Sequence, residues 1–159
     1  MKSTLPKTEI AEIQLKRAIS LYCEGSDLVC AITLAGAAEE ILGDLLLHQG
    51  CSTALEETAQ NSESMFRYAY PDDPLPPRKV WFALGNDPRN ELKHLRDGKP
   101  LTCDWEDEAQ SMINRAIKNF RRLGLVSLPD FYEFERVWLA RERAKEAAVL
   151  RAMDPPPGE

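Results

Sequence analysis

Residues 86–94, NDPRNELKH, gather side chains that together could handle a phosphate group. Arg89 carries a guanidinium suited to bidentate phosphate binding, and His94 carries an imidazole that titrates near neutral pH. On an ideal helix Asn90 and His94 lie four residues apart and share a face, and the long side chain of Arg89 can swing towards them. The segment could therefore bind or react with an anion, or it could be an ordinary solvated helix start.

The polar residues that open this stretch predict a helix boundary. Asn86, Asp87 and Pro88 are typical of a helix start, so we expect a helix from Pro88 to about Arg96. Free N–H groups at its first turn would favour an anion. Residues 78–99 hold six Lys or Arg against three Asp or Glu, whereas the whole chain has a net charge of −6. This balance argues against broad, non-specific duplex binding and leaves room for a local basic site.

Two adjacent glutamates, Glu39 and Glu40, lie in the middle of the most apolar segment of the chain. An unpaired buried carboxylate is costly, so at least one of them should meet a cation or a donor from another helix. They could form an internal ion pair, occupy an exposed edge, or make one wall of a polar site.

Hydrophobic periodicity and capping residues predict the elements that position these groups. They indicate an all-α, up-down bundle of about five to six helices in one domain, residues 1–153, followed by a disordered tail, residues 154–159. The expected helices cover residues 8–23, 27–49, 54–70, 88–96, 104–123 and a final stretch from Ser127 or Asp130 onwards, with a short helical or irregular piece at 78–85. Thr8, Asp27 and Asp104 are the expected N-caps.

The remaining composition favours a cytoplasmic protein without a metal or other cofactor. The four cysteines have no CxxC spacing and only two histidines could complete a metal set, so we expect mostly buried, reduced thiols. Acidic residues interrupt the longest apolar region, and the N-terminal residues lack an apolar core of signal-peptide length, so no membrane association is predicted.

The motif and its flanking helices resemble those of HEPN domains. RNELKH matches the Arg-x(4–6)-His motif of that family, including the frequent Asn after the Arg. AITLAGAAEEILGDLL is similar to the small-residue helix that precedes the motif in bacterial members, and DEAQSMINRAIKNFRRL is similar to the helix that follows it. The resemblance spans roughly residues 10–125.

The resemblance implies a helical bundle that dimerises and that, in many members, is a metal-independent endoribonuclease of a toxin–antitoxin or phage-defence system. Arg89 and His94 would then be the catalytic pair, with Asn90, Lys93 and either Glu39 or Glu40 in substrate-binding or supporting roles. A cognate antitoxin or a nucleotidyltransferase-like protein would be a partner. Other members keep the fold without demonstrated catalysis.

Cleavage of RNA without a metal needs a base for the 2′-OH, an acid for the leaving oxygen and a cation for the added phosphate charge. His94 could be base or acid, and Arg89 could hold the phosphate. A symmetric dimer would supply a second histidine, and DNA, which lacks the 2′-OH, should resist cleavage. The alternative is a non-catalytic, dimeric helical module that binds a partner protein or a nucleotide. A protein of the antitoxin or immunity class is a third alternative.

Overall fold

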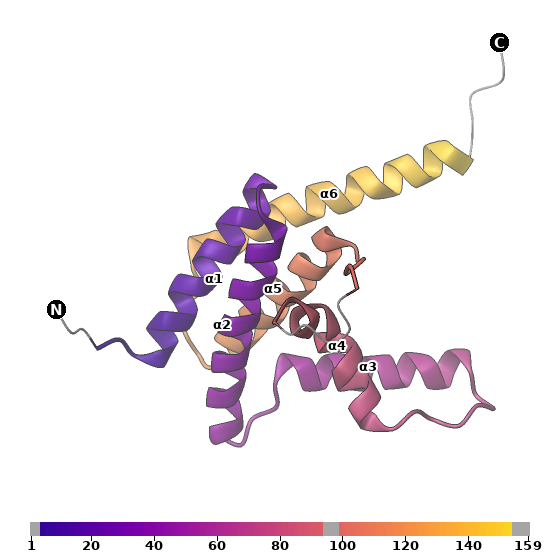
Figure 1. Ribbon diagram of the computed structural model, residues 1–159, viewed down its shortest axis with the longest axis horizontal. Helices are drawn as coiled ribbons and strands as arrows, with labels where there is room; N and C mark the ends of the chain where they lie inside the picture. The colour runs from indigo at the N-terminus through magenta and orange to yellow at the C-terminus, as the bar shows by residue number, and fades with distance from the viewer. Residues whose placement is uncertain (1–3, 94–98, 154–159) are drawn as a thin grey trace, which may run out of the picture.

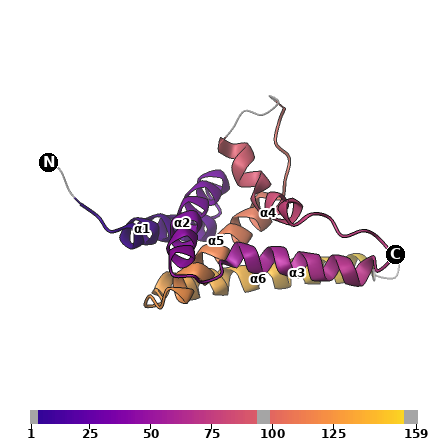
Figure 2. The same ribbon diagram turned by 90° about the horizontal axis from the view of Figure 1, so that it is seen from below.

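The computed structural model describes residues 4–93 and 99–153 of the chain, and this part is an all-α helical bundle without a strand. Figure 1 shows the helices in chain order and Figure 2 shows them turned by 90°. Their bounds are α1 (Lys7–Glu24), α2 (Leu28–His48), α3 (Ala54–Ala69), α4 (Arg78–Lys93), α5 (Trp105–Arg122) and α6 (Pro129–Met153). The predicted all-α fold class is confirmed.

Local capping explains where several helices begin. Asp27 accepts a hydrogen bond from the backbone N–H of Cys30, and Asp104 accepts from the N–H groups of Glu106 and Asp107, which confirms both predicted caps. Thr53 and Glu56 form a reciprocal capping box at the start of α3. Thr8 is not a cap: α1 begins at Lys7, one residue earlier, and no side chain caps it.

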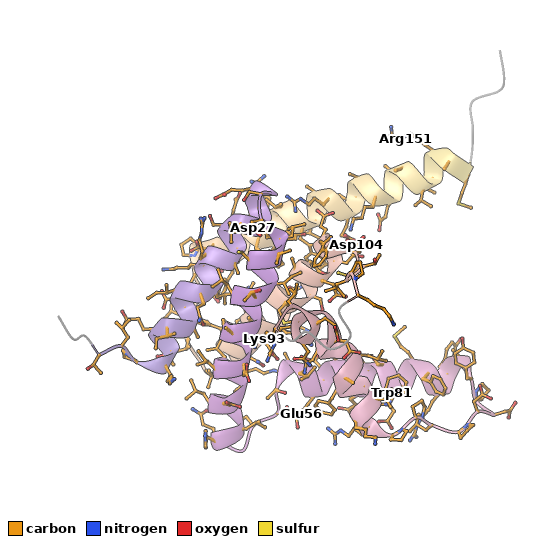
Figure 3. All side chains as sticks on the ribbon, in the orientation of Figure 1. Asp27, Glu56, Trp81, Lys93, Asp104 and Arg151 are labelled. Carbon is orange, nitrogen blue, oxygen red and sulfur yellow. The ribbon has the colours of Figure 1, made fainter. Side chains whose placement is uncertain are left out.

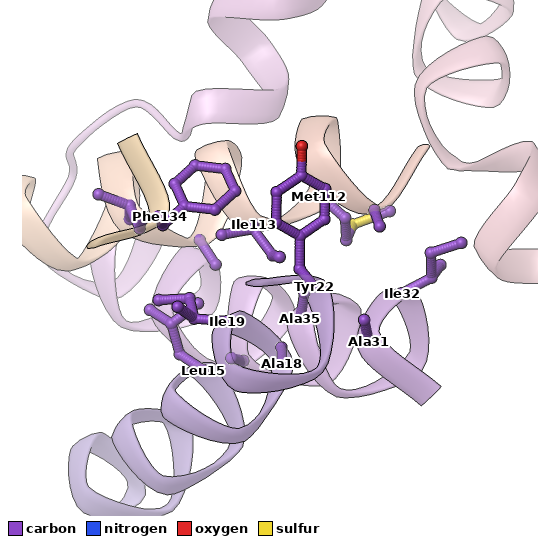
Figure 4. Packing of buried hydrophobic residues seen from close by; sticks show 14 of the residues in the cluster. Leu15, Ala18, Ile19, Tyr22, Ala31, Ile32, Ala35, Met112, Ile113 and Phe134 are labelled. Carbon is purple, nitrogen blue, oxygen red and sulfur yellow. The ribbon is translucent and has the colours of Figure 1, made fainter. Parts of the chain in front are cut away.

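The apolar core lies where α1, α2 and α5 pack together, with α6 closing one side. Small residues of α2 let the neighbouring backbones approach, and larger aliphatic and aromatic side chains fill the space between the helices (Figure 4). The fully buried large members include Leu15, Tyr22, Ile32, Leu42, Ile113, Ile117, Phe131 and Phe134. The helical stripe predicted on α5 is part of this core, because Met112, Ile113, Ala116, Ile117 and Phe120 are buried.

Helices α3 and α4 pack against each other beside the bundle, and both reach it through α2 or α5. In Figure 1, α3 lies beside the lower half of α2 at a steep angle to it, with α4 next to it. The aromatic rings of Phe66 and Trp81 join the two helices, with ring centroids 5.6 Å apart. This pair of helices therefore carries residues 86–93 of the motif to the side of α2.

The second half of α6 extends away from the other helices, with Arg151 near its far end (Figures 1 and 3). Val149, Leu150 and Met153 are exposed there. Within the described ranges, no helix has both the length and the apolar character needed to cross a membrane.

The predicted helix start at Asn86, Asp87 and Pro88 is wrong. Helix α4 is continuous from Arg78 to Lys93, so Asn86, Asp87 and Pro88 lie inside it instead of starting a new helix. Packing of Trp81 against α3 and hydrogen bonds to Gly85 and Asn86 hold the turns before the proline in helical form. Tertiary contacts here outweigh the local signal, which is usual for weak propensities.

The cysteines are also more accessible than expected. All four are free thiols; Cys30 and Cys51 are exposed, and Cys23 and Cys103 are partly buried. Cys30 lies in the first turn of α2 on its outward side, and Cys51 lies in the turn after that helix. Neither position faces the core, although cysteine is often a buried residue.

Candidate functional site

Arg89 is the motif residue that the structure places most clearly. It leaves α4 towards α2 and passes over Gly36, where a Cβ atom would overlap with the Arg89 side chain. Glycine therefore provides the close approach that this side chain needs. Arg89 is only 8% exposed, so most of its length is buried between the two helices.

The guanidinium of Arg89 is held by both of the predicted glutamates. Its Nη2 lies 2.8 Å from Oε2 of Glu40, and its Nη1 lies 3.6 Å from Oε2 of Glu39. Nη1 also donates a hydrogen bond of 3.2 Å to the Gly36 carbonyl oxygen. The prediction that at least one of these glutamates meets a cation or a donor from another helix is thus confirmed.

The two glutamates differ in their surroundings. The Glu39 side chain is 6% exposed, whereas that of Glu40 is 54% exposed and also lies 3.6 Å from Nζ of Lys93. Burial raises the pKa of Glu39, and the neighbouring guanidinium groups of Arg115 and Arg89 only partly oppose this effect. Glu39 is therefore the structural carboxylate of the site, and Glu40 is the one that solvent or a ligand can reach.

A second buried arginine, Arg115 of α5, completes the cluster on the other side of Glu39. Its Nε lies 3.9 Å from Oε1 of Glu39, and burial lowers the pKa of this guanidinium. We refer to Arg89, Arg115, Glu39 and Glu40 as the arginine–glutamate cluster. With all four groups ionised its charges sum to zero, and each of the three buried members, Arg89, Arg115 and Glu39, has an opposite charge nearby.

Sequence reasoning did not identify Arg115, although a signal was present. Arg115 and Asn119 continue from the apolar residue Met112 at spacings of three and seven, so they lie on a buried face of α5. Asn119 is fully buried, accepts a hydrogen bond from the Ala54 N–H and donates one to the Glu39 carbonyl oxygen. Polar residues at inward-facing helical positions were the available clue.

A groove between α2, α3 and α4 runs beside the cluster. Its cavity volume is about 220 Å³, which is below the usual range for drug-sized ligands and suits a side chain or a few waters. Carboxyl groups dominate the polar lining, and Arg89 is its cationic member: the acidic residues are Glu39, Glu40, Asp44 and Glu56. Phe82 and Leu55 provide apolar surface. The groove is therefore better suited to a cationic group than to a phosphate.

Two further residues of the motif, Asn90 and Lys93, lie beyond Arg89 on α4. Asn90 is partly buried on α4 and does not line the groove, and Lys93 ends α4 close to α2 (Figure 3). His94, the predicted second catalytic residue, lies outside the described residues. Because α4 continues through Pro88, the first-turn N–H groups expected beside Arg89 are not present, and the prediction of a helix N-terminus there is wrong.

His48 lies in the last turn of α2, where a cation favours the helix dipole. In the described part of the chain, no three or more His, Cys, Asp or Glu side chains are grouped so that they could hold a metal ion. No protein-family model, curated protein or solved structure matches this chain.

Proposed function

We propose that this chain is a HEPN-like protein that cleaves an RNA phosphodiester without a metal ion, in a toxin–antitoxin or defence system. The observation that carries the proposal is the placement of Arg89. The first residue of the RNELKH motif is held against α2 by two carboxylates and a backbone carbonyl. An arginine held this firmly has little conformational freedom left to lose when it binds a phosphate.

In this mechanism Arg89 binds the scissile phosphate and stabilises its added negative charge, and His94 transfers a proton to or from the sugar oxygens. Glu40 must give way, because its carboxylate occupies the Nη2 atom that a phosphate oxygen would use. Since Glu40 is half-exposed, it can turn into solvent at modest cost. Glu39 remains buried and keeps the Arg89 side chain oriented.

We further propose a homodimer, in which a second copy supplies the second histidine that a concerted acid and base step requires. A cognate antitoxin or nucleotidyltransferase-like protein would be its regulatory partner. Four free thiols, two of them exposed, fit the reducing conditions of the cytoplasm.

The second candidate function is a non-catalytic, dimeric helical module that binds a partner protein or a nucleotide. Two observations favour it: Arg89 is almost fully buried in ion pairs, and carboxylates surround the adjoining groove. These carboxylates repel a phosphate and attract a lysine or arginine side chain of a partner protein.

One experiment separates the two functions. Wild type, His94→Ala and Arg89→Lys are incubated with a mixed tRNA and mRNA pool in EDTA, and the new ends are mapped. The RNase proposal predicts 2′,3′-cyclic phosphate ends from wild type, loss of cleavage in both variants, and no cleavage of DNA. His48→Ala, which changes the other histidine, should cleave like wild type. Absence of cleavage by a folded, dimeric wild-type protein would overturn the RNase proposal in favour of the binding module.

A further inference from the structure

Arg115 contacts α4 at the turn that precedes Arg89. Its Nη1 donates a hydrogen bond of 2.6 Å to the carbonyl oxygen of Gly85, and its Nη2 donates one of 3.1 Å to Oδ1 of Asn86. Arg115 is 4% exposed and both bonds are partly buried, so each is more costly to lose than a bond at the surface.

Gly85 of α4 accommodates this approach. A Cβ atom on Gly85 would lie 2.9 Å from Cδ1 of Leu55 and 3.0 Å from Nη1 of Arg115, so a larger residue here would require both side chains to shift.

Arg115 also reaches Arg89 through Glu39. One carboxylate oxygen of Glu39 faces Nε of Arg115 at 3.9 Å, and the other faces Nη1 of Arg89 at 3.6 Å. The Nε–H groups of both arginines are buried and have no hydrogen-bond partner within the described residues. The carboxylate is thus placed between two guanidinium groups by charge, without a short hydrogen bond to either.

We propose that Arg115 is the positioning residue of the motif: it fixes the α4 turn before Arg89 and, through Glu39, sets the direction of the Arg89 guanidinium. A catalytic consequence of this positioning rests on the proposed function. The positioning itself concerns the folded protein alone and is tested without RNA.

The test compares Arg115→Met with Arg115→Lys and with Arg122→Met. Met keeps much of the side-chain volume without charge or hydrogen-bond donors. Lys restores the charge but cannot form both hydrogen bonds to Gly85 and Asn86 of α4. Arg122 is the matched control, because it lies on the same helix and bonds a carbonyl and a carboxylate, those of Ser52 and Glu57. Within the described residues, no hydrogen bond or ion pair joins Arg122 to the arginine–glutamate cluster.

Two NMR signals report the result: hydrogen exchange of the Arg89 Nε–H, and the pH titration of the Glu39 side-chain carboxyl carbon. Arg115→Met should speed the Arg89 exchange about tenfold or more, because loosening of α4 raises the local opening that permits exchange. Glu39 should titrate at higher pH, since its main opposing cation is gone. Arg115→Lys should restore the titration in part while leaving exchange fast, and Arg122→Met should match wild type.

Unchanged Arg89 exchange and an unchanged Glu39 titration in folded Arg115→Met would overturn the proposal. Should that variant fail to fold, Asn86→Ala removes only one of the two bonds to α4. It should speed the Arg89 exchange by a smaller factor, and no change there would also overturn the proposal.

RNA cleavage provides a separate readout. Misplacement of a catalytic group by about 1 Å can lower turnover about 100-fold, so Arg115→Met should reduce kcat with little change in KM. Arg115→Lys should recover part of this loss. If wild type cleaves no RNA, the proposed function fails, while the two NMR signals still decide whether Arg115 positions Arg89.

Discussion

Helix α2 takes part in two interfaces of opposite chemistry. On one face it contributes Ala31, Ala35 and Leu42 to the apolar core with α1 and α5. Glu39 shares that face, and Gly36 and Glu40 lie on the adjoining one; these three contribute to the arginine–glutamate cluster with α4 and α5. The core is held by many non-directional contacts, whereas the cluster is held by a few directional ones. The core should thus determine whether the bundle folds, and the cluster should determine where α4 and Arg89 lie.

The largest effect is expected in the core. Ile113 is fully buried on α5, and Ile113→Ala should lower the free energy of unfolding by about 4 kcal/mol, because the loss of apolar contact adds to the cost of a cavity. Urea denaturation measures this. Ile13→Ala is the matched control, since Ile13 of α1 is 53% exposed and its loss should change stability by no more than about 0.5 kcal/mol. Equal losses in the two variants would contradict this placement of the core.

A smaller loss is expected when the cluster is broken at Arg115. Arg115→Met leaves Glu39 with one guanidinium instead of two and should lower the free energy of unfolding by about 3 kcal/mol. The Arg122 side chain is one-third exposed, so Arg122→Met should lower the free energy of unfolding by no more than about 1 kcal/mol in the same urea assay. A loss in Arg115→Met no greater than that in Arg122→Met would mean that the buried cluster does not stabilise the fold.

The two interfaces also differ in how far the sequence revealed them. The core follows from the 3.6-residue period of α5 and the apolar character of α2, and the caps Asp27 and Asp104 follow from local chemistry. The arginine–glutamate side does not follow from the sequence pattern. The continuity of α4 through Pro88 depends on contacts from α3 and α5, which are distant from it in sequence. That at least one of Glu39 and Glu40 meets a cation or a donor followed from the cost of burying a carboxylate, whereas the identity of the two cations, Arg89 and Arg115, required the three-dimensional arrangement.

Glycine substitutions on α2 test the side that faces α4. Gly36→Ala should displace the Arg89 side chain and lower the free energy of unfolding by about 2 kcal/mol, because the added methyl group overlaps with it. At Gly43 a Cβ would lie 3.4 Å from Nδ2 of Asn119, so Gly43→Ala should stay within about 1 kcal/mol of wild type, helped by the better helix propensity of alanine. Urea midpoints of the two variants give the comparison, and a tolerated Gly36→Ala would contradict the close packing of Arg89.

The smallest effect is a pH dependence that comes from Glu39. Burial raises the pKa of this carboxyl group in the folded protein, so the folded state holds its proton more strongly than the unfolded chain does. The stability that this proton provides is complete below the ordinary pKa of a glutamate and is lost as the pH rises through the raised value. Glu39→Gln cannot ionise, so its stability relative to wild type should improve as the pH rises.

Urea midpoints of wild type and Glu39→Gln between about pH 4 and about pH 8 measure this difference. Glu24 supplies a control of opposite sign, because its hydrogen bond from Ser20 lowers the pKa of an exposed carboxyl group. That contribution is present above the ordinary pKa and is lost as the pH falls through the lowered value. Glu24→Gln should therefore lose stability relative to wild type as the pH rises. If the Glu39→Gln curve instead follows the Glu24→Gln curve, the two arginines lower the pKa of Glu39 by more than burial raises it. Ion pairing, and not the apolar surroundings of Glu39, would then dominate in the cluster.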